Sequence, residues 1–202
     1  MSVLHVYPGS FSPPTRGHEN IVRKAEKYFG NFFIICSENP NKKPWFTPEE
    51  CREMWRLYKL PYHIPILTLR EFESYMRDLR QRNPNLGIAI IRGLRSEQDM
   101  KDEMDVMTLN HRDYGIELFT YMFCDPGYTH ISSSAARLLT EFPEISGLGY
   151  EPYIHPDIVP ILKKRAEELN ANAIRTDTDG APSERLLTAE QVDGPGKVAT
   201  GL

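Results

Sequence analysis

Apolar residues recur along the chain in two patterns, short continuous runs and helical spacings. Positions 3–7 suit a buried strand, and similar runs cover residues 32–37, 64–69, 87–91 and 117–123. Between the runs, apolar residues fall three or four positions apart, as in Ile21, Val22, Ala25 and Phe29. Strands alternating with helices predict an α/β fold, a Rossmann-like doubly wound five-stranded parallel sheet with helices on both faces.

Capping residues locate the helices. Thr15 is the expected N-cap of the first helix, because Pro13 and Pro14 prevent a helix before it. Thr47 and Glu50 form a capping box around Pro48 and start a second helix. Further helices are expected over residues 72–82, 96–112, 132–140 and 155–170.

Charge and composition divide the 202 residues unequally. Residues 1–170 are expected to form one domain, whereas residues 171–202 are polar and turn-rich. The net charge of −4 comes from the end of the chain, since residues 1–165 hold 21 basic and 21 acidic residues. The sequence favours a flexible C-terminal extension, with docking on a neighbouring subunit as the alternative.

Several classes of protein are excluded by what the sequence lacks. No run approaches the length of a membrane span, no secretory signal is evident, and no basic stripe predicts nucleic-acid binding. Cys36, Cys51 and Cys124 are odd in number and widely spaced, which favours free thiols in a reducing compartment. A cytoplasmic protein without nucleic-acid or membrane partners is therefore expected. Glycine patterns typical of dinucleotide dehydrogenases and P-loop proteins are also missing.

Polar and cationic residues follow the predicted strands at the edge where parallel sheets bind ligands. Thr15-Arg16-Gly17-His18 follows the first strand, Lys42 and Lys43 the second, and Arg92-Gly93-Leu94-Arg95 the fourth. Residues 128–134 follow the fifth and hold three serines at a helix start. Arginine, lysine, hydroxyl groups and a helix N-terminus all suit phosphate oxygens.

Each of these segments also has a purely structural interpretation. His18 can stabilise a capped helix, the two lysines can lie in a solvated turn, and Arg92 can form an ion pair. One serine suffices for capping, and Glu103 can face either the site or a neighbouring subunit.

Together, the motifs resemble those of bacterial phosphopantetheine adenylyltransferases, a family of the nucleotidyltransferase superfamily. The resemblance covers about residues 4–165 and rests on residues 7–11, Thr15-x-Gly-His18, residues 42–47, residues 91–95, Glu103 and residues 131–134. It implies transfer of the adenylyl group of ATP to 4′-phosphopantetheine, giving dephospho-CoA and pyrophosphate. It also implies Mg²⁺ as cofactor, a homo-oligomer that is commonly hexameric in the family, and feedback by CoA.

The resemblance assigns roles residue by residue. The catalytic residues are His18, Lys42 and Arg92, and the substrate-binding residues are Ser10, Lys42, Glu73 and Arg92. No residue is assigned as a metal ligand. The ATP-binding residues are Ser10, Phe11, His18, Gly93, Leu94, Arg95, Glu103, Tyr128, Thr129, His130, Ile131, Ser132, Ser133 and Ser134.

Departures from the family pattern keep other functions open. Ser12, Asp102 and Gly127 replace an aspartate, an aromatic residue and a polar or acidic residue, which puts nucleotide or metal affinity in question. The alternatives are another adenylyl- or cytidylyltransferase, for example one acting on nicotinate mononucleotide, and a nucleotide-binding regulator without turnover. A fragment of an aminoacyl-tRNA synthetase would need a second lysine-rich signature and a tRNA-binding surface, and the sequence shows neither.

Overall fold

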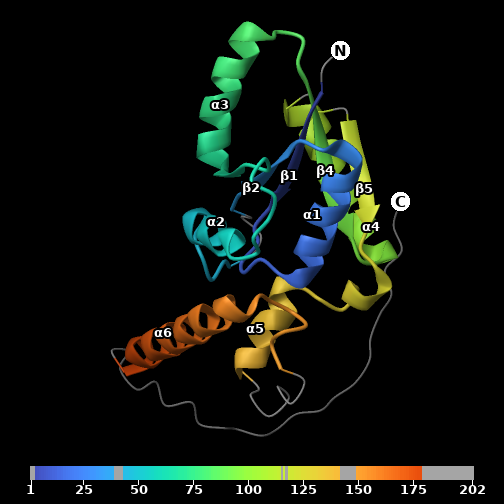
Figure 1. Cartoon of the computed structure of the whole chain (residues 1–202). Coiled ribbons are helices and arrows are strands. Elements are labelled where there is room, and N and C mark those ends of the chain that lie inside the picture. Colours follow the sequence, from blue (N-terminus) through green and yellow to red (C-terminus); the bar gives the residue numbers. More distant parts are fainter. Residues whose placement is uncertain (1–2, 39–42, 115, 117, 142–148, 179–202) are drawn as a thin grey trace, which may run out of the picture.

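The computed structural model describes residues 3–38, 43–114, 116, 118–141 and 149–178. Strands and helices alternate along the chain in the order that the sequence predicts (Figure 1). The elements are β1 (Val3–Gly9), α1 (Arg16–Phe29), β2 (Phe32–Cys36), α2 (Pro48–Arg56), β3 (Ile66–Thr68), α3 (Leu69–Arg82), β4 (Gly87–Leu94), α4 (Glu97–Tyr114), β5 (Leu118–Phe123), η1 (Pro126–Tyr128), α5 (Ser133–Glu141), η3 (Pro156–Ile158) and α6 (Val159–Thr178).

The five strands form one parallel sheet in the order β3-β2-β1-β4-β5. β1 lies at the centre, where Tyr7 pairs with Ile34 of β2 and Val6 pairs with Ile90 of β4. The chain therefore reverses its direction of winding beside β1, the position where open α/β sheets bind ligands. The predicted fold class, a doubly wound five-stranded parallel sheet, is confirmed.

Alternate residues of the central strands face two separate apolar layers. Tyr7, Ile34 and Ile91 pack with residues of α1, α2 and α6 on one face. Val6, Ile35 and Ile90 pack with residues of α3 on the other face. Because side chains alternate along a strand, this arrangement also determines the face of the sheet toward which each polar residue at a strand end is directed.

β3 is shorter and α3 begins earlier than the sequence analysis predicts. The strand ends at Thr68, whose side chain accepts a hydrogen bond from Glu71 N–H, while the Glu71 carboxylate accepts one from Thr68 N–H at 2.8 Å. This capping box starts α3 at Leu69, where an apolar residue had suggested a continuing strand. Apolar content does not distinguish the last residue of a strand from the first of a helix.

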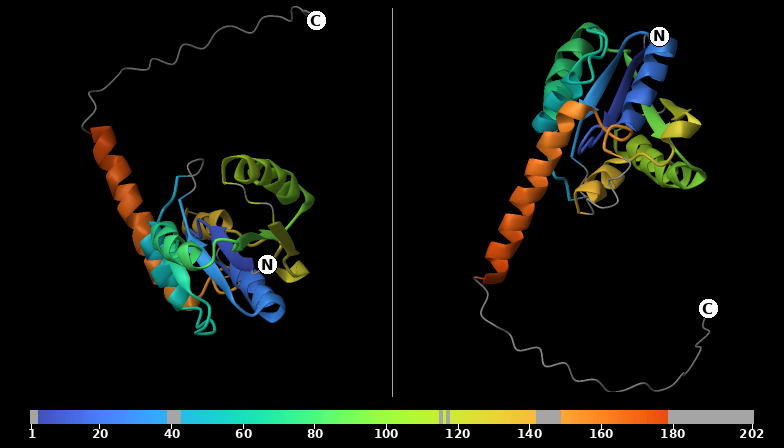
Figure 2. Two further views of the ribbon diagram at one scale, coloured as in Figure 1. Left: turned by 90° about the horizontal axis from the view of Figure 1, so that it is seen from above. Right: turned by 60° about the horizontal axis from the view of Figure 1, so that its bottom comes forward.

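α6 continues to Thr178, beyond the predicted end at residue 170. No glycine or proline interrupts residues 161–178, so helical backbone is not disfavoured there. Figure 2 shows α6 projecting away from the sheet. Within the described part of the chain, no helix is long and apolar enough to cross a membrane. The rest of the predicted extension, residues 179–202, lies outside the described residues.

Candidate active site

The turn after β1 places the aromatic ring of Phe11 against His18. Phe11 has a positive φ of 45°, and its side chain is buried. A Cβ at Gly9 would lie 2.6 Å from the Phe11 ring, so this close approach requires glycine. The Phe11 ring contacts the rings of His18 and Trp55 edge-on, with centroids 5.0 and 5.2 Å away. The buried ring leaves the main chain of Phe11 for contact with a nucleotide. That contact stays a prediction.

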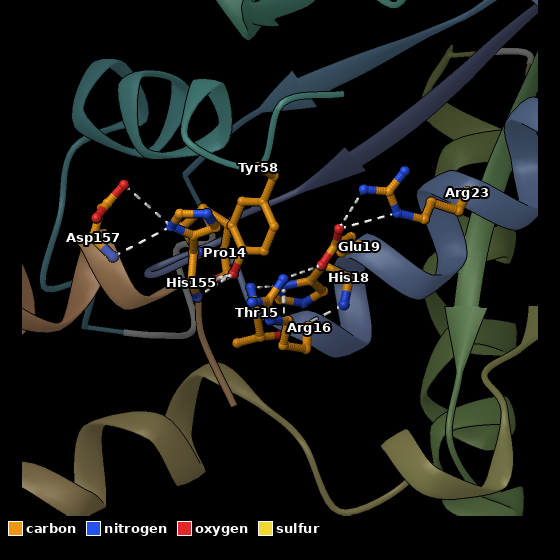
Figure 3. Close-up of polar contacts among 9 residues, drawn as sticks. All are labelled: Pro14, Thr15, Arg16, His18, Glu19, Arg23, Tyr58, His155 and Asp157. Atoms are coloured by element: carbon orange, nitrogen blue, oxygen red, sulfur yellow. Dashed lines mark hydrogen bonds and ion pairs between the residues drawn. The ribbon is translucent and has the colours of Figure 1, made fainter. Parts of the chain in front are cut away.

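His18 is oriented by the cap of α1 (Figure 3). Thr15 N–H donates to Nδ1 of His18 at 3.1 Å, and His18 N–H donates to Thr15 Oγ1 at 3.3 Å. This is a capping box with histidine at the position that usually holds glutamate or glutamine. Because Nδ1 accepts a hydrogen bond, the proton of the neutral ring lies on Nε2. His18 therefore has Nε2–H as its donor.

Two main-chain N–H groups at the start of α1 have hydrogen-bond partners within the protein. Arg16 N–H donates to the carbonyl of Tyr153 at 2.8 Å, and His18 N–H is taken by Thr15. A helix N-terminus with open N–H groups was the sequence-based interpretation of this segment. In the structure, the side chain of His18 is a further donor at this helix start.

A buried carboxylate fixes the first two turns of α1. Glu19 is 8% exposed and accepts hydrogen bonds from Arg16 at 2.8 Å and from Arg23 at 2.7 and 3.0 Å (Figure 3). Two guanidinium groups compensate the desolvation of this carboxylate. Arg16 and Arg23 consequently stabilise the helix that carries His18.

Arg92 lies at the end of β4 and is held by Glu103 of α4. Nε of Arg92 donates to Oε2 of Glu103 at 2.5 Å, and Nη2 donates to Oε1. Nη1 donates to the carbonyl of Pro8 in β1 at 3.2 Å. The fork-to-fork pair fixes the guanidinium plane and leaves one N–H of Nη1 and one of Nη2 outside these bonds. Glu103 therefore faces the sheet edge of its own chain and orients Arg92.

The other residues of this strand end have different roles. Leu94 is fully buried, and a Cβ at Gly93 would lie 2.8 Å from Ile21, so Gly93 lets α1 approach β4. Arg95 donates to the carboxylate of Asp99 through Nε and Nη2 at 2.9 and 2.7 Å. Partial burial alone would raise the pKa of Asp99, but hydrogen bonds from Arg95 outweigh burial and lower that pKa.

The segment after β5 lies against the turn that carries His18. Ser132 caps α5, since its Oγ accepts from Ala135 N–H at 3.0 Å. Ser133 Oγ donates to the carbonyl of Pro13 at 2.7 Å, and a Cβ at Gly17 would lie 3.3 Å from the carbonyl of Ile131. The bond from Ser133 and the close approach at Gly17 bring the start of α5 close to the start of α1.

The three serines of this segment therefore differ. Ser132 and Ser133 are used in capping and in tethering, whereas Ser134 is exposed and accepts from Arg137 at 3.1 Å. His130 and Thr129 are exposed, Tyr128 is half-buried, and Ile131 is buried. ATP contacts from this segment stay a prediction, and Ser134 is the serine whose side chain is most accessible to it.

Ser12 has a structural role that its chemistry explains. Its buried Oγ accepts hydrogen bonds from the main-chain N–H groups of Trp45 and Phe46, both at 3.1 Å. Those residues belong to the segment that leads from β2 to α2. Ser12 therefore links the turn after β1 to that segment, which is a structural function for the position where the family has aspartate.

Three predicted site residues remain, Lys42, Glu73 and Ser10. Lys42 is outside the described residues, so its role stays a prediction. Glu73 is exposed on α3, and Ser10 is half-buried in the turn after β1. Of the predicted catalytic residues, Arg92 contacts Pro8 of β1 and His18 contacts Phe11 in the turn after β1, so both lie near the carboxyl end of that strand.

One positioning contact was missed by the sequence analysis. Asn20 of α1 donates to Asp125 at 2.6 Å and accepts from Asp125 N–H at 3.0 Å, which ties α1 to the start of η1. Lys24 adds an ion pair to Asp125 at 2.5 Å. Asn20 and Asp125 are 105 positions apart in the chain. The only signal for this contact in the sequence would have been an asparagine and an aspartate that are expected at the same edge of the sheet.

Within the described residues, no three histidine, cysteine, aspartate or glutamate side chains are grouped so as to hold a metal ion. A phosphate-bound Mg²⁺ does not need such a cage, because it keeps several waters and takes its other ligands from phosphates. A Mg²⁺ cofactor therefore stays a prediction.

Comparisons with known proteins identify the family of the chain. A model of the cytidylyltransferase-like family matches residues 6–138. A solved nicotinic acid mononucleotide adenylyltransferase from Plasmodium falciparum, complexed with NaAD, has a TM-score of 0.51 and 14% identity and covers 84% of this chain and 97% of its own. That likeness supports the fold. The fold and the family match define a nucleotidyltransferase of the cytidylyltransferase-like class.

Closer relatives narrow the class. The phosphopantetheine adenylyltransferase of Ralstonia pickettii is 32% identical over 167 residues, covering 81% of this chain and 93% of the relative. That of Heliobacterium modesticaldum is 34% identical over 163 residues, covering 81% and 90%. The chain belongs to the phosphopantetheine adenylyltransferase family.

Proposed function

We propose that this enzyme transfers the adenylyl group of ATP to 4′-phosphopantetheine and releases pyrophosphate. The phosphate of phosphopantetheine attacks the α-phosphate of ATP in line, and the products are dephospho-CoA and pyrophosphate. The observation that supports the proposal is that Arg92 contacts the end of β1 and His18 contacts the turn after it, in a chain of the phosphopantetheine adenylyltransferase family.

The chemistry needs charge stabilisation more than proton transfer. A phosphate monoester has a second pKa of about 6 and is largely a dianion at neutral pH, so it needs no general base. The barrier is the approach of two anions and the charge that spreads over the transferred phosphoryl group. Fixed donors and cations lower such a barrier because they need no reorganisation during the reaction.

The residues divide this task between them. His18 donates from Nε2–H to an oxygen of the α-phosphate, and its orientation is fixed by Thr15. Arg92 holds the phosphate of phosphopantetheine through the N–H groups that Glu103 and Pro8 leave available. Lys42 supplies a further mobile positive charge to that phosphate. Ser10 lies between the two substrates.

Mg²⁺ neutralises charge on the phosphates of ATP when it is bound. It is proposed to enter with the nucleotide, because Mg²⁺ keeps several waters and takes its other ligands largely from substrate phosphates. Removal of Mg²⁺ with a chelator should abolish pyrophosphate release and leave the thermal unfolding of the ligand-free protein unchanged.

Three further features of the family extend the proposal. The enzyme acts in the cytoplasm as a homo-oligomer, with a hexamer as the expected assembly, and CoA inhibits it. Light scattering measures the assembly, and pyrophosphate release with increasing CoA measures the feedback.

The decisive experiment compares acceptors. Pyrophosphate release is measured with ATP and 4′-phosphopantetheine, then with nicotinate mononucleotide in place of phosphopantetheine, and then with CTP in place of ATP. The proposal predicts turnover only with ATP and phosphopantetheine. Turnover with nicotinate mononucleotide would indicate another member of the superfamily, and binding of ATP without turnover of any acceptor would indicate a regulator.

A further inference from the structure

The hydroxyl group of Tyr58 contacts the turn that precedes α1. Tyr58 lies just after α2, it is 3% exposed, and its ring packs among the aromatic residues of the core. Its hydroxyl donates to the carbonyl of Pro14 at 3.0 Å and accepts from the main-chain N–H of His155 at 3.2 Å. Figure 3 shows Tyr58 between Pro14 and His155.

The carbonyl that Tyr58 holds belongs to the same peptide group as the N–H that holds His18. Pro14 C=O and Thr15 N–H are the two polar ends of one planar unit, and Thr15 N–H donates to Nδ1 of His18 at 3.1 Å. Because the peptide group is rigid, fixing its carbonyl also fixes the direction of its N–H. Hydrogen bonds in such a chain also polarise and strengthen one another.

The surroundings of Tyr58 also hold the next peptide group, between Thr15 and Arg16. The guanidinium of Arg16 lies 5.6 Å from the centroid of the Tyr58 ring, and Arg16 N–H donates to Tyr153 at 2.8 Å. The segment that leads into η3 thus contacts the turn before α1 directly through Tyr153 and indirectly through Tyr58. Burial raises the pKa of Tyr58, so its hydroxyl stays protonated and remains a donor at neutral pH.

We propose that Tyr58 is a positioning residue for catalysis, whose hydroxyl orients the Pro14–Thr15 peptide group and thereby holds His18 with its proton on Nε2. The proposal rests on the function proposed for His18. It goes beyond that function because it assigns the orientation of His18 to a side chain 40 positions further along the chain. Loss of the hydroxyl would leave Pro14 and His155 without this partner while the aromatic packing remains.

The test is Tyr58→Phe, which removes one oxygen atom and retains the ring. Tyr62→Phe is the matched control, because Tyr62 is fully exposed and lies four residues away. We expect Tyr58→Phe to lower kcat by about tenfold, as small displacements of a catalytic group do, with little change in KM for either substrate. Tyr62→Phe should leave both constants unchanged. Thermal unfolding of each variant establishes that the assays are made on folded protein.

A double-mutant cycle separates positioning of His18 from a general structural role. If Tyr58 acts through His18, Tyr58→Phe should lower kcat in the wild type and have little further effect in His18→Ala. An equal loss of kcat in both backgrounds would overturn the proposal. If His18→Ala retains normal kcat, the role proposed for His18 fails, which is a distinguishable outcome.

The ¹⁵N NMR signals of the His18 ring give a readout that does not depend on activity. We expect the wild type to show Nδ1 unprotonated and Nε2 protonated, and Tyr58→Phe to show a mixture of the two tautomers or a shifted Nδ1 signal. An unchanged Nδ1 signal in folded Tyr58→Phe would overturn the proposal even if kcat had fallen.

Discussion

Replacement of Ser12 with alanine tests how the turn after β1 is joined to the segment before α2. The Ser12 hydroxyl oxygen is 3.1 Å from the N–H groups of both Trp45 and Phe46, and the bond to Phe46 is buried. Alanine fits the same space but accepts no hydrogen bond. Ser12→Ala therefore leaves two main-chain donors without this acceptor, one of them fully out of water.

The expected loss of stability follows from these two donors. A buried donor left without a partner costs about 1–3 kcal/mol, and a half-buried one costs less because water reaches it. The free energy of unfolding should fall by about 2–4 kcal/mol in all. For a chain of this size the midpoint of thermal unfolding should fall by roughly 5–15 °C.

Calorimetry or circular dichroism measures that midpoint. Ser74→Ala is the matched control, because Ser74 is exposed on α3 and its replacement should change the free energy of unfolding by less than about 0.5 kcal/mol. A midpoint for Ser12→Ala within a degree or two of the control would refute the reasoning. It would mean that water or a local shift satisfies both N–H groups.

Three more predictions follow from the contacts at the sheet edge. Glu103→Gln should raise KM for 4′-phosphopantetheine about tenfold in steady-state assays, because hydrogen bonds to a charged group contribute about 1.5–3 kcal/mol and hold Arg92 in place; an unchanged KM would contradict the orienting role. Asp99 has a folded-state pKa below its ordinary value of 3.8, so its contribution to stability is present above that pH and is lost as pH falls through the lowered value. Urea unfolding should accordingly show Asp99→Asn less stable than the wild type at neutral pH and equal to it in strong acid; a difference that persists in acid would be inconsistent with this linkage. Gly93→Ala should lower the free energy of unfolding by about 1–3 kcal/mol, since its Cβ would lie 2.8 Å from a side chain of α1, whereas Gly127→Ala meets nothing within 4 Å and serves as the control; equal stability of the two variants would exclude the close packing as a cause.

Local chemistry was enough to predict the order of elements and the sheet. The first helix begins after Thr15 and the second after Thr47, as their capping residues indicate. Both are cases in which a side chain satisfies N–H groups a few residues away, so a short stretch of sequence contains the whole interaction. The same interaction at Thr68 was missed because the neighbouring apolar residues favoured a longer strand.

The candidate site could be predicted only in part. The positions of His18 and Arg92 follow from the strand ends, since parallel strands place their carboxyl ends at one edge. The partner of Arg92 could not be decided, because Glu103 lies on a helix whose rotation about its axis the sequence leaves open. In the structure, Glu103 faces Arg92 of the same chain.

Contacts between distant parts of the chain were not predictable. Tyr58 lies 44 positions from Pro14 and 97 from His155, and a tyrosine at helical spacing is most simply a core residue. Ser12 was a departure from the family pattern that put nucleotide or metal affinity in question, but its hydroxyl accepts hydrogen bonds from residues 33 and 34 positions away. Such roles depend on tertiary packing, which has no local signature.

The central claim is that His18 stabilises the transferred phosphoryl group in the transition state. The most direct measurement is kcat and KM for His18→Ala with ATP and 4′-phosphopantetheine, at a temperature where thermal unfolding shows the variant to be folded. The account predicts that kcat falls by roughly 10² or more while KM changes little, because the interaction is made mainly in the transition state. A kcat close to that of the wild type would contradict it.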